Sequence, residues 1–118
     1  MRQLVFAYNA DGGLANLLKD AAHKVLRPAT YPCSLCAVTY GPLGMRRRWA
    51  AFVRGLPARV RFLHRDELRA EFGDPPDPLP ALYEVDPPAT LRQLIGKAAL
   101  DACGDLDALE ALVRARVG

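Results

Sequence analysis

Two cysteines separated by two residues, Cys33 and Cys36, are the side chains of this sequence best suited to chemistry. Their spacing allows a disulfide within one turn of chain, or two thiolates on one metal ion. Residues 21–65 contain nine Lys and Arg and no Asp or Glu. Positive charge of this kind stabilises a thiolate and lowers a thiol pKa from about 8.5. We therefore expect a reactive pair, whereas burial as two small apolar side chains is the structural alternative.

Polar groups that could move a proton follow the predicted strands. Asn9 and Asp11 come after the first apolar run, and His64 and Asp66 come after a later one. If the two strands are parallel, these residues gather at the carboxyl edge of the sheet, where ligands bind in open α/β folds. Histidine suits proton transfer near neutral pH. The simpler roles are helix capping for Asp11 and Asp66 and a strand end for His64.

The elements that position these residues follow from periodicity and from Gly and Pro punctuation. The Tyr31–Tyr40 segment is β-branched and aromatic, and it predicts a short strand or an extended crossing segment. In the next helix we expect Trp49, Phe52 and Val53 to point inward. The other predicted elements are strand 3–8, a helix from Leu14 to about Val25, helix 45–55, strand 60–63, helix 66–72, loop 73–80, strand 82–85, its hairpin partner 91–95, and a final helix 105–116.

A second use of the cysteines is metal binding. His23 falls on the outer side of the first predicted helix, and Cys103 lies just before the last one. Either of these, or His64, could join Cys33 and Cys36 to hold Zn²⁺ or Cu⁺, for which thiolate and imidazole are suitable ligands. The structural alternative is that His23 is an exposed helix residue and that Cys103 is an ordinary core or surface cysteine.

The basic half of the chain also contains the run Arg46-Arg47-Arg48. Such a run is usually a solvated helix face, and the alternative is a docking surface for an anionic substrate or an acidic partner. Residues 66–118 hold eleven acids against five bases, so the two halves of the chain differ in sign. Aromatic residues do not interleave with the arginines, and we expect no nucleic acid partner.

Length and composition predict one domain spanning residues 1–118. A chain of 118 residues with 51% apolar and 25% charged residues is typical of a globular domain with a single core. We find no apolar run long enough to cross a membrane and no signal peptide at the start. The expected location is therefore the cytoplasm, where cysteines are mostly reduced, and no membrane partner is expected. Oligomeric state is left open.

The order of the predicted elements resembles that of thioredoxin-like proteins. When a segment at about 27–57 is treated as an insert, the remaining order is βαβαββα, an α/β fold. Pro80 directly precedes the third strand and matches the cis-proline position of that fold, which predicts a cis Leu79–Pro80 bond. The sequence departs from thioredoxins where their Cys-x-x-Cys opens the first helix, because residues 9–13 contain no sulfur.

The chain also resembles a small, functionally uncharacterised bacterial family, whose members are sometimes labelled GTPases by automated transfer. The motifs that carry this resemblance are Tyr8-Asn9-Ala10-Asp11-x-Gly13, Thr30-Tyr31-Pro32-Cys33-Ser34-Leu35-Cys36 and Phe62-Leu63-His64-Arg65-Asp66-Glu67. The GTPase label has no support here, because the sequence lacks the Gly-x-x-x-x-Gly-Lys-Ser/Thr loop that wraps phosphates.

These observations lead first to a thiol redox protein that needs no cofactor. Cys33 is the expected nucleophile and Cys36 the resolving thiol, with the reverse assignment as the alternative, and His64 or Asp11 is expected to accept and donate protons. The partner would be a thiol or disulfide, in a protein or a small molecule. The expected substrate groove is formed by Tyr8, Asn9, Pro80 and Asp66. The alternatives are the Zn²⁺ or Cu⁺ module, and an adaptor without chemistry that docks through its basic segment.

Overall fold

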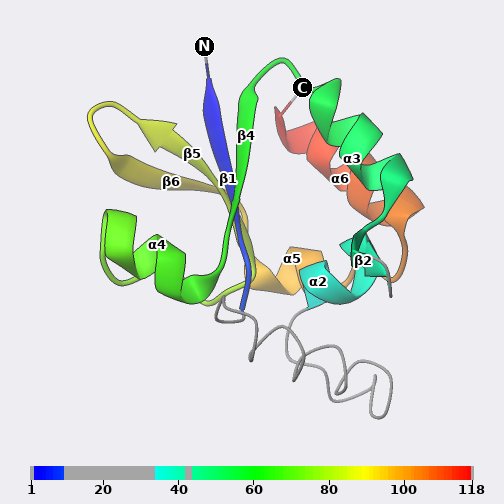
Figure 1. Ribbon diagram of the computed structural model, residues 1–118, viewed down its shortest axis with the longest axis horizontal. Coiled ribbons are helices and arrows are strands. Elements are labelled where there is room, and N and C mark those ends of the chain that lie inside the picture. The colour runs from blue at the N-terminus through cyan, green and yellow to red at the C-terminus, as the bar shows by residue number, and fades with distance from the viewer. Residues whose placement is uncertain (1, 10–33, 42–43, 118) are drawn as a thin grey trace.

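The computed structural model describes residues 2–9, 34–41 and 44–117 and shows a mixed α/β domain (Figure 1). Four strands form one sheet in the order β4-β1-β5-β6, and the described residues include five helices. The strands of this sheet are β1 (Gln3–Ala7), β4 (Arg59–Leu63), β5 (Ala81–Asp86) and β6 (Thr90–Ile95). The four strands predicted from the sequence are thus confirmed, with bounds that differ by one or two residues.

The central strand of the sheet is β1. It runs parallel to β4, with Ala7 opposite Leu63, and antiparallel to β5, with Ala7 opposite Ala81. β6 completes the sheet as an antiparallel partner of β5, and a register shift at Leu82 and Tyr83 marks a bulge. Because β1 and β4 are parallel, their carboxyl ends lie at the same edge of the sheet, as expected.

The remaining elements lie around this sheet. The helices are α2 (Ser34–Thr39), α3 (Arg47–Arg54), α4 (Arg65–Phe72), α5 (Lys97–Asp101) and α6 (Leu106–Val117), and a small hairpin consists of β2 (Tyr40–Gly41) and β3 (Gly44–Met45). The hairpin and α5 were not predicted, because each is too short to show a clear period. None of the helices described is both long and apolar enough to cross a membrane.

The expectation of a strand or an extended segment at Tyr31–Tyr40 is wrong for its described part. Residues 34–39 form α2, and only Tyr40 is extended. Leu35 and Thr39 are both buried, and they lie four residues apart on one helix face. The Thr39 hydroxyl donates a hydrogen bond to the Leu35 carbonyl at 2.7 Å. Burial of this face therefore outweighs the weak β preference of Val38 and Thr39.

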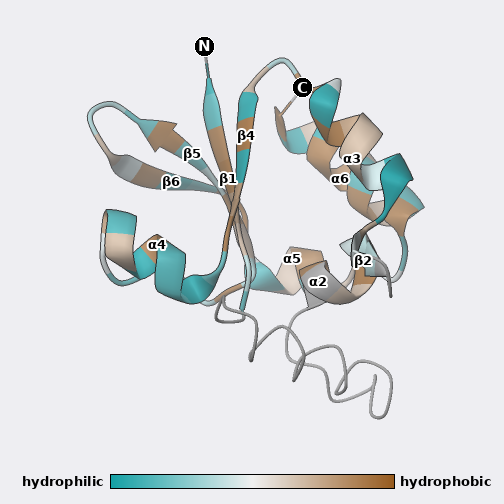
Figure 2. Cartoon of the chain, viewed as in Figure 1, coloured by the Kyte–Doolittle hydropathy of each residue, from teal (hydrophilic) through white to brown (hydrophobic). Residues whose placement is uncertain are grey.

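The side chains of β1 alternate between two apolar layers. Leu4, Phe6 and Tyr8 belong to the larger cluster, which also takes buried residues from α2, α3, α5 and α6. Val5 and Ala7 face the smaller cluster, to which α4 contributes Leu68. Figure 1 shows α3 and α6 on one side of the sheet and α4 on the other, and Figure 2 shows apolar stretches along β1 and α6. The four β1 residues among them and Tyr8, which directly follows the strand, are fully buried.

Helix α3 is part of the core, although it lies inside the segment that the sequence suggested as an insert. Trp49 is fully buried and meets the Phe6 ring edge-on at a centroid distance of 5.4 Å. Val53 is buried and Phe52 half-buried beside it, while Arg47 and Arg54 are exposed, which confirms the predicted inner and outer faces. α3 precedes β4 directly and packs against α6. Among the described residues, α2 and α3 are the helices between the parallel strands β1 and β4, and α3 is the one that leads directly into β4. The helix predicted from Leu14 to about Val25 lies outside the described residues.

Replacing Trp49 with alanine should lower the free energy of unfolding by about 3–5 kcal/mol, because it leaves a large cavity against β1. Arg54→Ala on the exposed side of the same helix is the control and should change stability by no more than about 0.5 kcal/mol. Urea unfolding followed by far-UV circular dichroism measures both. A loss below about 1 kcal/mol for Trp49→Ala would show that α3 is peripheral.

Candidate functional site

The carboxyl edge of β1 and β4 is the part of the fold where the predicted site residues meet. The backbone N–H of Tyr8 donates to the Leu63 carbonyl at 2.9 Å, which extends the parallel pairing by one residue. Tyr8 and Asn9 therefore leave β1 beside His64, which leaves β4. Pro80 belongs to the same edge, because the next residue, Ala81, pairs with Ala7.

The Tyr8 ring is the centre of this edge. It is fully buried and meets the Tyr40 ring at 5.8 Å and the His64 ring at 5.4 Å, measured between centroids. On β4 it stacks with Phe62 at 6.0 Å. Tyr40 directly follows α2, so Tyr8 connects the end of α2 with the start of α4. Tyr8 is one of the residues predicted for the substrate groove, whereas Tyr40 was not predicted as a site residue.

His64, and not Asp66, is the N-cap residue of α4. The carboxylate oxygen Oε1 of Glu67 accepts a hydrogen bond from the His64 backbone N–H at 2.8 Å and lies 2.7 Å from Nδ1 of the same residue. These contacts lower the pKa of Glu67, first through the backbone N–H and then through the imidazole. Glu67 was missed in the sequence, although a Glu three residues after a cap is a known signature.

Asp66 and Asn9 lie at the same edge in supporting roles. The Asp66 carboxylate accepts a hydrogen bond from the Glu67 backbone N–H at 3.0 Å in the first turn of α4. The Asn9 side-chain oxygen lies 3.4 Å from the Arg65 guanidinium. Helix α4 ends at Gly73, whose φ of 86° suits a residue without a side chain. The structure thus brings Asn9, His64 and Asp66 together, while Asp11 lies outside the described residues.

Pro80 is buried, and its peptide bond with Leu79 is cis, as predicted. The loop before it, residues 73–80, contains no helix or strand, also as predicted. Near this loop the hydroxyl of Tyr83 is buried close to Asp77. Burial, and then the Asp77 charge, raise the pKa of Tyr83 to about 12. This tyrosine therefore stays protonated and belongs to the smaller core cluster.

The two cysteines of the pair are described only in part. Cys33 and the His23 proposed as a metal ligand lie outside the described residues, and Cys36 is described by its backbone, as the third residue of α2. The location of α2 is nevertheless informative. Leu35 belongs to the same buried cluster as Tyr8, and Tyr40 packs on the Tyr8 ring. The helix that carries Cys36 thus lies against the carboxyl edge of β1.

Cys103 is buried, and its sulfur lies 3.4 Å from the Ala99 carbonyl. Burial, and then the charge of Asp105, raise the pKa of this thiol. A protonated thiol that donates to a backbone carbonyl is a poor metal ligand. Within residues 2–9, 34–41 and 44–117, no group of three His, Cys, Asp or Glu side chains is arranged to hold a metal ion.

The arginine run is partly occupied by contacts within the chain. Arg48 pairs with Asp107 and with Glu110, whose carboxylate is buried and lies 3.2 Å from the Arg48 Nε. The Nε of Arg46 donates to the Val38 carbonyl at 3.1 Å, whereas Arg47 is exposed. Arg48 therefore joins α3 to α6, and this interaction reduces the surface charge that a docking partner could use.

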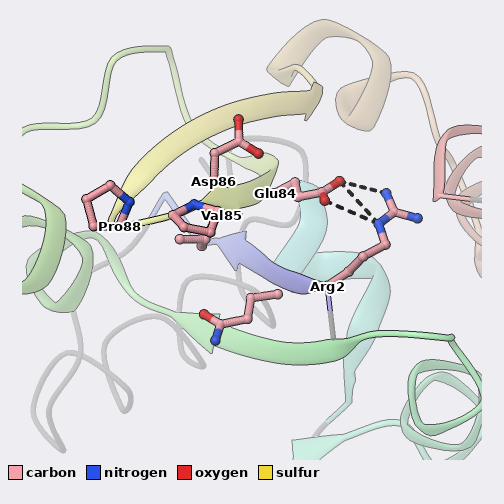
Figure 3. A pocket seen from close by; sticks show the side chains of 7 residues that line it. Arg2, Glu84, Val85, Asp86 and Pro88 are labelled. Atoms are coloured by element: carbon pink, nitrogen blue, oxygen red, sulfur yellow. Dashed lines mark hydrogen bonds and ion pairs between the residues drawn. The ribbon is translucent and has the colours of Figure 1, made fainter.

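A groove at the opposite edge of the sheet is lined by Arg2, Gln3, Glu84, Val85, Asp86, Pro87 and Pro88 (Figure 3). Its charges are paired internally. Arg2 binds Glu84 at 2.7 Å and donates to the Val117 carbonyl at 2.7 Å, and Arg92 lies 3.1 Å from both Glu84 and Asp86. The network joins β1, β5, β6 and the end of α6. We assign it a structural role.

Glu84→Gln should lower stability at pH 7 and reduce its dependence on acid. The hydrogen bond from Arg2, and then the Arg2 charge, hold the pKa of Glu84 below 4.5, its ordinary value. The unfolded chain therefore binds more protons in this range, and wild-type stability falls as pH drops from 4.5 through the lower folded-state value. The difference between variant and wild type should be largest at pH 7 and shrink in acid.

Urea unfolding between pH 7 and pH 3 measures this difference. Gln3→Ala, in the same groove, is the control, and it should leave the pH dependence unchanged because it removes no titratable group. A Glu84→Gln difference that stays constant across the range would contradict the assignment.

Comparison with known proteins yields no match to a family model, to a curated protein or to a solved structure. The site is therefore defined by this chain's own geometry. It consists of Tyr8, Asn9, His64, Glu67 and Pro80 at one sheet edge, with α2 packed beside them.

Proposed function

We propose that this chain is a thioredoxin-like thiol–disulfide protein whose redox pair is Cys33 and Cys36. The observation that supports this most is the position of α3 as the crossover helix between β1 and β4. The cysteine pair then lies in the connection between the first strand and its crossover helix. In the thioredoxin order, the cysteines also follow the first strand and precede the body of that helix.

The order of the large elements gives further support. With α3 as the crossover helix, the larger elements among the described residues run β1, α3, β4, α4, β5, β6, α6, which corresponds to βαβαββα. Helix α2, the β2–β3 hairpin and α5 are additions to that order. The segment from 27 to 57 is then better divided, because α2 and the hairpin are the additions and α3 belongs to the basic fold.

The sheet edge provides the groups that such a reaction needs. The cis Pro80 lies beside Tyr8, and His64 is one-third exposed at the same edge. Helix α2, which contains Cys36, packs there through Leu35, and Tyr40, the residue directly after the helix, contacts Tyr8. Of the nine bases in residues 21–65, Arg48 and Arg61 are paired with acids, so the electrostatic support for a thiolate comes from fewer arginines than the sequence count suggests.

The proposed reaction reduces a partner disulfide with two electrons. The Cys33 thiolate attacks one sulfur of the partner disulfide, forming a mixed disulfide and releasing the other sulfur as a thiolate. Cys36 loses its proton to His64 and attacks the Cys33 sulfur. This step forms the Cys33–Cys36 disulfide and releases the second partner sulfur as a thiolate. Asp11 is the alternative proton carrier. No cofactor takes part.

The test is performed in a Cys103→Ser background, which removes the third thiol. Oxidised glutathione should convert the protein to a form lighter by two hydrogens that resists alkylation. Cys33→Ser and Cys36→Ser should each abolish the intramolecular disulfide. The pH dependence of alkylation should give a pKa for Cys33 below about 8.

Protein that keeps two alkylatable thiols after oxidation, with a Cys33 pKa above about 8.5, would contradict the proposal. Metal analysis of wild-type protein purified without chelator separates the metal-binding alternative. One Zn²⁺ or Cu⁺ per chain, lost in Cys33→Ser, would favour that alternative over redox exchange.

A further inference from the structure

The contact between Glu67 and His64 determines which imidazole nitrogen carries the proton. The Glu67 Oε1 atom lies 2.7 Å from Nδ1 and 2.8 Å from the His64 backbone nitrogen, so one oxygen bridges two nitrogens of the same residue. The lowered pKa of Glu67 keeps this carboxyl ionised near neutral pH. A carboxylate oxygen and a bare imidazole nitrogen would repel each other at 2.7 Å. Nδ1 must therefore be the donor.

We infer that Glu67 is a positioning residue that fixes His64 as the Nδ1–H tautomer and leaves Nε2 with a lone pair for accepting a proton. The Tyr8 ring, at 5.4 Å and tilted by 47°, limits rotation of the imidazole from the other side. The His64 side chain is 33% exposed, so the ring is held but remains accessible.

The groups around His64 come from α4 and from the end of β1. The charged neighbours on α4 are Arg65, Asp66 and Glu67, and the neighbour that follows β1 is the neutral ring of Tyr8. The Glu67 carboxylate lies within hydrogen-bond distance of Nδ1, and the capping box also brings the Glu67 backbone N–H toward the His64 side chain. When Nε2 takes a proton, the ring becomes a cation, and the Glu67 carboxylate stabilises that charge.

The role of Nε2 in proton transfer rests on the proposed thiol exchange. The proton that Nε2 accepts is that of the resolving thiol, Cys36, as its sulfur becomes the nucleophile. The same proton passes from Nε2 to the thiolate that the partner releases, which restores the neutral Nδ1–H imidazole. Glu67 does not take part in bond changes. It determines which nitrogen is basic and where that nitrogen points.

The tautomer is measured directly by ¹H–¹⁵N correlation of ¹⁵N-labelled protein, at a pH where His64 is neutral. Wild type should show a protonated Nδ1 and a bare Nε2. Glu67→Ala should shift the population toward Nε2–H, because the acceptor for Nδ1–H is gone. Glu71→Ala is the matched control, since Glu71 lies one turn along α4 and pairs with Arg61 at 2.7 Å. It should leave the tautomer unchanged.

The kinetic test uses the rate of disulfide exchange with oxidised glutathione. Glu67→Ala should slow exchange roughly tenfold, as expected for loss of a group that orients a histidine. His64→Ala should slow it by about 100-fold. In the His64→Ala background, adding Glu67→Ala should cause no further loss, because Glu67 acts only through His64. Glu67→Gln keeps an oxygen acceptor and should restore part of the rate even if the alanine variant is less stable.

Each outcome separates the inference from the proposed function. An unchanged tautomer in Glu67→Ala overturns the inference, whatever the cysteines do. A shifted tautomer with an unchanged exchange rate overturns the role in proton transfer and leaves thiol exchange standing. If wild-type protein shows the Nδ1–H form but no exchange at all, the tautomer assignment holds, and both the proposed function and the proton-transfer role are wrong.

Discussion

The packing of Trp49 on Phe6 is the interaction on which the rest of the fold depends. It holds α3, the helix that leads directly into β4, against the central strand of the sheet. The second contact of α3, the Arg48 pair with buried Glu110, fixes it against α6. Burying a carboxylate is costly unless it is paired, so this ion pair specifies the arrangement of the two helices.

Most of the fold could be predicted because its signals are local. Strands β1 and β5 are apolar runs bounded by turn residues, and α3 has a regular apolar face around Trp49 and Val53. The role of α3 could not be predicted, because a helical period shows that one face is buried but not what it packs against. α2 was missed for a related reason, since the burial of Leu35 and Thr39 is a tertiary effect that propensity does not contain.

The site residues that directly follow or precede a strand could be predicted, because the pairing of the strands brings them together. Tyr8, Asn9 and His64 meet because β1 and β4 are parallel, and Pro80 joins them because Ala81 pairs with Ala7. The cap of α4 was assigned two residues too late, because Asp is the more usual capping residue. With the cap assigned to Asp66 instead of His64, the hydrogen bonds between Glu67 and His64 were not predicted. The contact depends on the first turn of one short helix, and residue type alone did not reveal it.

The central place of β1 has a consequence for synthesis on the ribosome. Its neighbours in the sheet begin at Arg59 and Ala81, so the strand that comes first in the chain pairs only with segments made much later. Until β4 leaves the exit tunnel, the run Leu4-Val5-Phe6-Ala7 lacks its sheet partners. Non-local pairing of this kind slows folding and leaves apolar chain exposed. The nascent chain should therefore be a substrate for chaperones that bind short extended apolar segments.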